Sequence, residues 1–434
     1  MIIIKEFKMV EYSSERSGMD FINGFSHSGK PVKDLGRIRR LLGALGDPQD
    51  KLDFVHIAGT NGKGSVAEMF NRIFISAGLK TGCFTSPFIL RYNDRIRIDG
   101  CDIPDGELAQ IAEKVRAAVI KLPEKDEFSQ FEITQAIAFL YFVKHAVDIV
   151  VLETGLGGLL DCTNVISSPL LTVITTIDLD HTAILGGTVA QIAAQKAGII
   201  KPGVPCVLSA DNHDEAVDVV RAAAQKNGSQ LVIPDITAAV VTHADHFGSR
   251  FEYGGQQYTL SMGGAHQVKN ALSVIEGCWL LADKLGLSQL NIEYGIEKAV
   301  LPARVEVLCK KPLTILDGAH NPDGLSALAK VLAECKQRCY AIIGMCADKN
   351  IDNAVQKLIP FVEQFYTVDG FSDRALGRSE LADRINSLGG KAQPCGLPIN
   401  VQIKALQKTH PNDLILICGS LYLAAEVNNA NKKS

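Results

Sequence analysis

The amino-acid sequence predicts an α/β protein: a P-loop-containing, parallel-sheet domain of the ATPase type, followed by a smaller Rossmann-like C-terminal α/β domain. Short apolar, β-branched runs alternate with helical patterns along most of the chain, as in folds with a parallel sheet. A glycine-rich loop with a lysine directly follows one of these runs. A proline near residue 300 precedes a fresh set of strand and helix patterns. We therefore expect one domain over residues 1–300 and a second over residues 305–434.

The composition excludes several classes of protein. The 434 residues suffice for two or three domains, and a net charge of −4 favours neither nucleic acid nor an anionic membrane as partner. The eleven cysteines are dispersed, which is typical of a reducing compartment. The amino-terminal residues lack the pattern of a signal peptide, and the longest apolar run, Ala136 to Val143, is too short to span a membrane. We expect a cytoplasmic protein.

The glycine-rich loop lies in the stretch VHIAGTNGKGSVAEMF, residues 55–70. Its glycines let backbone N–H groups approach phosphate oxygens, and the helical pattern from Val66 to Ala77 would point its positive end at them. Lys63 would contact the terminal phosphates. The alternative is a glycine-rich turn before a helix. The candidate phosphate-binding residues are Gly59, Thr60, Asn61, Gly62, Lys63, Gly64 and Ser65.

The spacing within this loop departs from the usual P-loop, in which a serine or threonine directly follows the lysine. Here Gly64 separates Lys63 from Ser65. The loop therefore indicates phosphate binding, but not by the standard form of the motif.

Three apolar runs are expected to end at one edge of the parallel sheet. They cover residues 54–58, 147–152 and 171–177, and each is followed by a polar or glycine-rich loop: GTNGKGS, ETGLGG and DLDHT. The carboxyl ends of parallel strands lie at the same edge, where ligands bind. The sequence therefore predicts that these three loops form one site.

Two of these loops carry side chains suited to metal chemistry. Glu153 ends the second run as the acidic Walker B residue does in P-loop enzymes, although a solvated carboxylate is the common alternative. His181 lies on the third loop beside Asp178 and Asp180. A lone histidine is more often structural, but its place on this edge favours a role in the site.

The C-terminal part repeats the alternation of strands and helices. The strand pattern of LTILDGAHNP, residues 313–322, is followed by a helical pattern, and further strands are expected at 340–345, 365–368 and 414–418. Arg304 lies just after the proline hinge, where domain closure would bring its guanidinium onto phosphate oxygens. A surface ion pair is the alternative role of Arg304.

Seven motifs, in order along the chain, resemble the folylpolyglutamate synthase and dihydrofolate synthase family of the Mur ligase superfamily, whose members are ATP-dependent amide-forming ligases. The motifs are AGTNGKGSV, TSPF, ETGLGG with LDCTN, LDHT, QKAGIIKPG, HQVKNA and DGAHNP. The resemblance runs from about Gly36 to Val427. A glycine between the lysine and the serine is the form of P-loop that this family has, so the resemblance accounts for Gly64.

The resemblance implies an ADP-forming ligase that adds L-glutamate to a folate with the help of ATP and Mg²⁺. The acceptor is a tetrahydrofolate, dihydropteroate or both. Its carboxylate would be phosphorylated by ATP, and the amine of glutamate would attack the acyl phosphate, which requires positioning and charge neutralisation. We expect a monomer whose partners are these small molecules. Two alternatives stay open: another Mur-type amino-acid ligase, and a P-loop regulatory NTPase.

The resemblance also implies roles for residues around the metal and the reacting groups. Ser86 and Glu153 would bind one Mg²⁺, and His181 would help to hold a second. Ser86 could equally serve the turn before Pro87. Lys196 would be carbamylated by CO₂ and would act as an anion. The implied catalytic residues are Lys63, His181, Lys196 and Arg304.

The resemblance places further residues on the nucleotide and the folate. Asn270 would lie near the adenine, and Arg304 would contact the phosphates of ATP. Asp317 and His320 would reach the nucleotide from the second domain. For the folate, the resemblance implies ring stacking by Phe131 and a polar contact from Asp161. Phe131 could equally be a core residue of the helix expected over 131–143.

The sequence departs from the family pattern at three positions. Leu159 stands where the family typically has arginine, Gln195 where it has glutamate, and Ala303 where it has glycine. Leu159 lacks the charge and the five donors of a guanidinium, which puts the rate or the choice of substrate in question.

Overall fold

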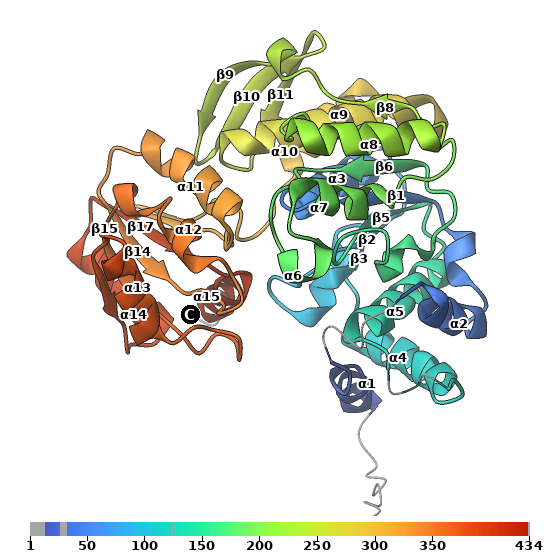
Figure 1. The fold of residues 1–434 in the computed structure, drawn as a ribbon, viewed down its shortest axis with the longest axis horizontal. Coiled ribbons are helices and arrows are strands. Elements are labelled where there is room, and N and C mark those ends of the chain that lie inside the picture. Colours follow the sequence, from blue (N-terminus) through green and yellow to red (C-terminus); the bar gives the residue numbers. More distant parts are fainter. Residues whose placement is uncertain (1–13, 27–32, 124, 126, 433–434) are drawn as a thin grey trace, which may run out of the picture.

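The computed structural model describes residues 14–26, 33–123, 125 and 127–432. The first 13 residues, on which the expected lack of a signal peptide partly rests, lie outside this range. Figure 1 shows two lobes, one built from the chain up to α10 and the other from β12 onward. No helix in the described ranges is long and apolar enough to cross a membrane.

The first lobe is built on an eight-stranded sheet with the order β4-β3-β2-β5-β1-β6-β7-β8. Strands β2, β5, β1, β6, β7 and β8 run parallel, while β3 and β4 are antiparallel to their neighbours. The strands are β1 Phe54–Ala58, β2 Thr81–Phe84, β3 Ile96–Ile98, β4 Cys101–Asp102, β5 Ile149–Glu153, β6 Leu171–Ile174, β7 Cys206–Leu208 and β8 Leu231–Val232.

Helices cover both faces of this sheet, so its central strands are almost continuously apolar. One face packs against α3 Lys63–Ser76, α9 Ala265–Leu285 and α10 Gln289–Lys298. The opposite face packs against α1 Ser14–Asn23, α2 Gly36–Ala44, α4 Asp105–Val119, α5 Gln130–Lys144, α7 Val189–Ala197 and α8 Asp214–Lys226. The short helix α6, Thr182–Leu185, precedes α7.

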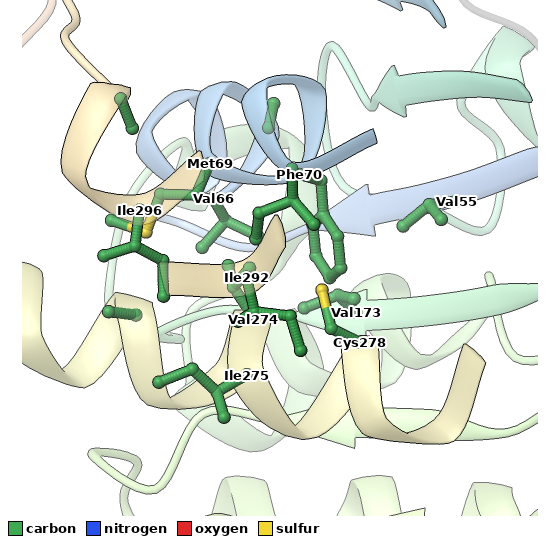
Figure 2. Close-up of a cluster of buried hydrophobic side chains, with 14 of the residues drawn as sticks. Val55, Val66, Met69, Phe70, Val173, Val274, Ile275, Cys278, Ile292 and Ile296 are labelled. Carbon is green, nitrogen blue, oxygen red and sulfur yellow. The ribbon is translucent and has the colours of Figure 1, made fainter. Parts of the chain in front are cut away.

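The core on the α3 face joins distant parts of the chain. Figure 2 shows Phe70 of α3 beside Cys278 of α9 and Val173 of β6. A three-stranded antiparallel sheet, made of β9 Val240–Asp245, β10 Gly248–Tyr253 and β11 Gln256–Leu260, packs onto the same core. This packing fixes α3, whose first turn carries the glycine-rich loop.

The second lobe is a six-stranded sheet with the order β12-β13-β17-β14-β15-β16, parallel except for β12. Its strands are β12 Glu306–Lys310, β13 Leu313–Leu316, β14 Cys339–Ile343, β15 Val362–Thr367, β16 Ala392–Pro394 and β17 Leu414–Cys418. Helices α11 Pro322–Glu334, α12 Ile351–Val355 and α13 Arg378–Ser387 cover one face, and α14 Ile399–Thr409 and α15 Leu421–Lys432 cover the other. The predicted fold class, a parallel-sheet domain followed by a smaller α/β domain, is confirmed.

Several expected boundaries shift by a few residues, and one shift matters for the site. The strand expected over 171–177 ends at Ile174, while β5 extends to include Glu153. Helix α3 begins at Lys63 rather than Val66, because Gly62 ends the loop with a left-handed backbone (φ 88°) and the helix follows at once. Lys63, Gly64 and Ser65 therefore form the first turn of the helix.

Gly295 allows α10 to pack tightly against α3. A Cβ atom there would lie 2.4 Å from Cγ1 and 2.5 Å from Cα of Ile73. We expect Gly295→Ala to lower the free energy of unfolding by about 1–3 kcal/mol, because a backbone atom cannot move aside as a side chain can. Urea unfolding of Gly43→Ala is the control: Gly43 is an exposed helical glycine whose nearest atom would lie 3.9 Å away. Equal unfolding curves for both variants would contradict this packing.

Candidate active site

A cavity of about 300 Å³ lies between the two lobes. Its lining combines the glycine-rich loop, residues after β5 and β6, the start of α9, and residues of the second lobe that precede β12 and follow β13. Strands β5, β1 and β6 are direct neighbours and run parallel. The prediction that their three loops share one edge is confirmed.

Two glycines of the loop are required by close contacts. A Cβ at Gly59 (φ 155°) would lie 1.7 Å from Oγ1 of Thr175, and a Cβ at Gly62 would lie 2.6 Å from Oδ1 of Asn270. Asn270 therefore packs directly against the loop, while its own amide donates to Oε1 of Gln267. Asn270, the residue expected near the adenine, thus lies next to the glycine-rich loop.

Lys63 folds back over the loop. Its Nζ donates to the carbonyls of Gly59 at 3.0 Å and Thr60 at 3.2 Å. Burial lowers the pKa of Lys63, an effect that the carboxylates of Glu153 and Asp180 partly offset. Lys63 is half-buried in the first turn of α3, where an exposed position would be usual for a lysine.

The remaining loop residues are held by neighbours. Thr60 donates its N–H to the carbonyl of Thr176 at 2.7 Å, and the carbonyl of Asn61 accepts from the hydroxyl of Thr175 at 2.6 Å. The Oγ of Ser65 is buried and has no hydrogen-bond partner among the described residues. A Cβ at Gly64 would lie 3.3 Å from Cδ2 of Leu301 and 4.0 Å from Oε2 of Glu153, so the extra glycine lies beside that carboxylate.

The candidate metal ligands come from three strand ends. The buried carboxylate of Glu153 accepts from the N–H of Ser86 at 3.2 Å, and burial raises its pKa against the opposing charge of Lys63. The Ser86 hydroxyl lies 3.3 Å from Nη2 of Arg95. His181 is 40% exposed, takes a left-handed backbone (φ 49°) and precedes α6. Within the described ranges, no three His, Cys, Asp or Glu side chains form a group that could hold a metal ion.

Lys196 lines the cavity from α7 although it is 97% buried, with only 3% of its surface exposed. Burial, and then the nearby charge of Lys63, lower its pKa to about 7. A substantial fraction of this amine is therefore uncharged at neutral pH, unlike an ordinary lysine.

Asp317 of the second lobe binds the backbone of the hinge at Val305, the residue after Arg304. The carboxylate of Asp317 accepts from the N–H of Val305 and from that of Ala319, both at 2.8 Å. Val305 and Ala303 take left-handed backbones, with φ of 48° and 57°, which are strained for residues with a Cβ. The strain explains why glycine suits position 303 better than the alanine of this chain.

His320 faces the cavity as a neutral group. Its Nδ1 donates to the carbonyl of Gly318 at 2.9 Å, which leaves Nε2 as an acceptor. Burial, and then the charge of Lys349, lower its pKa to about 4. Arg304 also lines the cavity.

Three contacts that join the two lobes were not predicted from the sequence. Lys349 donates to Asp180 at 3.1 Å, and Asn321 donates to the other carboxylate oxygen at 3.2 Å. Asn61 donates to Asp323 at 2.7 Å. Lys349 follows the carboxyl end of β14, so the strand-edge rule that identified the other loops was the available signal.

The two candidate folate residues lie behind the cavity wall. Phe131 and Asp161 do not line the cavity. The ring of Phe131 packs against Gly155, where a Cβ would lie 2.6 Å from Cε1, and against Phe84 at 5.6 Å between ring centroids. The buried carboxylate of Asp161 accepts from the N–H of Leu156 at 2.8 Å, and burial raises its pKa. Both side chains therefore support the loop that forms the wall.

Of the three departures, Leu159 lies nearest to solvent. Its side chain is 45% exposed, and its N–H donates to the carbonyl of Gln195 at 2.7 Å. Its backbone packs on Gly198, where a Cβ would lie 2.5 Å from Cα of Leu159.

Comparisons with known proteins identify the family. The Mur ligase middle domain matches residues 57–277, and the Mur ligase glutamate ligase domain matches residues 303–421. The chain is 34% identical to the dihydrofolate synthase/folylpolyglutamate synthase of Bacillus subtilis, over 92% of this chain and 95% of that protein. The chain belongs to the folylpolyglutamate synthase and dihydrofolate synthase family of Mur ligases.

Solved structures of family members agree with this fold. The folylpolyglutamate synthase of Mycobacterium tuberculosis complexed with ADP matches with a TM-score of 0.86 at 27% identity, covering 96% of this chain and 98% of that one. Escherichia coli FolC in complex with DHPP and ADP matches with a TM-score of 0.83 at 27% identity, covering 97% and 98%. The family resemblance drawn from the motifs is confirmed.

The ion pair between Lys349 and Asp180 is expected to hold the lobes together, because its side chains are only 10% and 16% exposed. We expect Lys349→Met to raise the KM for ATP about tenfold, which corresponds to 1.4 kcal/mol, and to increase the radius of gyration in small-angle scattering. The control is Arg374→Met, since the pair of Arg374 with Asp348 is about half exposed and contributes little. Unchanged values in Lys349→Met would show that the lobes do not depend on this pair.

Proposed function

We propose that this protein is an ADP-forming ligase that joins L-glutamate to a folate carboxylate through an acyl phosphate. The observation that carries the proposal is the convergence of Lys63, Glu153, Lys196 and Arg304 on one cavity between two lobes. The domain boundary is proposed to lie between residues 300 and 305. We also propose that the protein acts as a monomer in the cytoplasm, since one chain supplies every group named here.

The chemistry begins with an unreactive carboxylate. An oxygen of the folate carboxylate attacks the γ-phosphorus of ATP, and ADP leaves with the electrons of the broken P–O bond. The amine of glutamate, as the free base, then attacks the acyl carbon; phosphate leaves and the amine loses a proton. Catalysis of these steps needs orientation and charge stabilisation rather than a protein nucleophile.

The residues of the first lobe suit the phosphate end of ATP. The N-terminal turn of α3 directs backbone N–H groups and its positive end toward an anion, with Gly59, Thr60, Asn61, Gly62, Gly64 and Ser65 as the cradle. Lys63 would leave the carbonyls of Gly59 and Thr60 and turn toward the β- and γ-phosphates. Asn270, packed against Gly62, is proposed to lie near the adenine.

The second lobe would complete the site on closure. Arg304 is proposed to bind phosphate oxygens with its planar guanidinium. His320 offers a neutral acceptor at Nε2, and Asp317 holds the strained hinge at Val305. Movement at this hinge would carry Arg304 and His320 toward or away from the phosphates.

The donor set around Glu153 fits Mg²⁺. Magnesium prefers oxygen ligands and is usually held by one or two carboxylates together with substrate phosphates. Glu153 provides a carboxylate, Ser86 a hydroxyl, and the Oγ of Ser65 is a buried polar atom without a partner. His181 is a less usual ligand and is proposed to help hold a second ion. Bound Mg²⁺ would neutralise the negative charge that develops on the phosphates.

For the folate, the proposed contacts are ring stacking by Phe131 and a polar contact from Asp161. Access to either side chain requires the loop from Gly155 to Gly157 to adjust, because Gly155 packs against the ring of Phe131. Both tetrahydrofolate and dihydropteroate are proposed as acceptors.

The function is tested by ADP release with tetrahydrofolate or dihydropteroate as acceptor. ADP should form only when ATP, one acceptor and L-glutamate are all present. ADP formation with ATP alone would indicate a regulatory NTPase, and activity only with cell-wall precursors would indicate a different Mur-type ligase.

Lys63→Ala should lower turnover by roughly 10³-fold, in the range found when a donor to transition-state charge is removed. Its circular dichroism should match the wild type, since among the described residues the Nζ of Lys63 donates to loop carbonyls alone. Turnover close to the wild type in a folded variant would remove the phosphate-binding role.

Glu153→Gln keeps the size of the side chain but removes its charge. We expect the half-saturating Mg²⁺ concentration to rise at least tenfold, because an amide oxygen is a weaker ligand for a hard cation. Thr154→Val is the control, because it alters the neighbouring buried side chain and keeps the carboxylate. Superimposable Mg²⁺ titrations of Glu153→Gln and wild type would exclude Glu153 as a ligand.

Lys196 is proposed to carry a carbamate, since its burial and its pKa of about 7 supply the free amine that attacks the carbon of CO₂ and then loses a proton. Carbamate occupancy should fall as the pH drops below about 7, because protonation removes the amine. A ¹³C-carbamate signal after incubation with ¹³C-bicarbonate measures this. Lys196→Ala should lack the signal and nearly all activity, and small carboxylic acids should restore part of that activity. Full activity of the variant would contradict the proposal.

A further inference from the structure

Three buried side chains form a hydrogen-bonded chain that ends at Asp161. His56, in the middle of β1, lies with Nε2 2.9 Å from the hydroxyl of Thr163. That hydroxyl lies 2.6 Å from Oδ1 of Asp161, which also accepts from the N–H of Thr163 at 3.0 Å. Thr163 belongs to the short 3₁₀ helix η3, Cys162–Val165. His56 and Thr163 are fully buried, and Asp161 is 7% exposed.

The direction of these hydrogen bonds is fixed by the chemistry of the groups. An ionised carboxylate only accepts, so the single hydroxyl proton of Thr163 points to Asp161. The Thr163 oxygen must then accept from His56, which requires a proton on Nε2 and leaves Nδ1 bare. Burial, and then the charge of Lys201, lower the pKa of His56 to about 3, in keeping with a neutral ring.

A histidine in the middle of this buried strand is energetically unfavourable, and packing alone does not explain its presence. The other residues of β1 are Phe54, Val55, Ile57 and Ala58, so His56 interrupts a continuous apolar strand. Its Nδ1 is buried and has no hydrogen-bond partner among the described residues, which is energetically unfavourable. An apolar side chain at this position would avoid that cost. Buried polar atoms in proteins rarely lack a hydrogen-bond partner. The unpartnered Nδ1 of His56 therefore indicates that the N–H at Nε2 has a role beyond the packing of β1.

This chain of hydrogen bonds fixes the orientation of the carboxylate of Asp161. While Oδ1 is held by Thr163, Oδ2 accepts from the N–H of Leu156 at 2.8 Å. Leu156 lies in the cavity wall, and the adjacent Gly155 packs against the ring of Phe131. The position of His56 is thus linked, through Thr163 and Asp161, to both groups proposed to contact the folate.

We propose that His56 is a positioning residue for the folate: through Thr163 it orients the carboxylate of Asp161 and the wall loop at Leu156. This inference rests on the proposed function, in which Asp161 contacts the pterin ring. His56 touches no substrate itself. Its loss therefore affects binding of the folate and spares the binding of ATP and glutamate.

The test compares variants that remove the donor with variants that keep it. Steady-state kinetics use whichever of tetrahydrofolate and dihydropteroate the wild type ligates. His56→Leu and Thr163→Val should raise the KM for the folate about tenfold and leave the KM for ATP and for glutamate within about twofold. His56→Gln, which has an amide N–H near the position of Nε2, and Thr163→Ser should stay near the wild type. The double variant His56→Leu/Thr163→Val should be no worse than Thr163→Val alone.

Thr81→Val is the matched control. Thr81 is a fully buried threonine of β2 whose hydroxyl donates to the carbonyl of Leu79 at 2.9 Å, and no hydrogen bond in the described part of the chain links that hydroxyl to Asp161. It should leave the KM for the folate unchanged. A wild-type KM in both His56→Leu and Thr163→Val, or an equal rise for all three substrates, would overturn the positioning role.

Two outcomes separate this inference from the proposed function. A wild-type protein without ligase activity would refute the proposed function, whereas an active wild type with unaffected variants would refute only the role of His56. If His56→Leu does not fold, ¹⁵N NMR of histidine-labelled wild type still tests the chain of bonds. A neutral ring with its proton on Nε2 between pH 6 and 8 is expected, and a proton on Nδ1 would overturn the inference.

Discussion

The register between β1 and β5 is the constraint on which the rest of the cleft depends. Ile57 of β1 pairs with Glu153 of β5, so the carboxylate at the end of β5 stands beside the start of the glycine-rich loop. On the other side of β1, Ala58 pairs with Ile174 of β6. A shift of one residue would turn Glu153 to the other face of the sheet. The two apolar layers that cover the sheet therefore hold the catalytic geometry as well as the fold.

The cavity concentrates positive charge in a partly buried place. Lys63 and Arg304 both lie in it, and the charge of Lys63 helps to lower the pKa of Lys196. Like charges held together in this way are unfavourable in the empty site and become favourable once a polyphosphate is bound. The carboxylates of Glu153 and Asp180 offset part of the repulsion. Such a balance suits a site that must bind ATP and stabilise the charge of a transferring phosphoryl group.

How far the sequence predicts this molecule differs between its parts. The strands at Phe54–Ala58 and Leu414–Cys418 match their apolar runs to the residue, because both faces of these strands are buried. The position of the three loops at one edge of the sheet was predictable, because the strands before them are parallel. The start of α3 at Lys63 was missed, since the backbone of Gly62 and its contact with Asn270 decide it. Lys349 lies after the carboxyl end of β14, but its bond to Asp180 joins residues 169 positions apart, so no local pattern identified its partner. A role for His56 was not predicted, because this residue lies within an otherwise apolar run.

Activation of the folate carboxylate as an acyl phosphate can be followed with an oxygen isotope. The acceptor is prepared with ¹⁸O in both oxygens of its reacting carboxylate and is ligated to L-glutamate with unlabelled ATP. If the carboxylate is phosphorylated, each molecule of inorganic phosphate released carries one ¹⁸O atom and the amide product carries the other. Unlabelled phosphate from a reaction that still forms the amide would contradict this activation, because the carboxylate oxygen would never have been bonded to phosphorus.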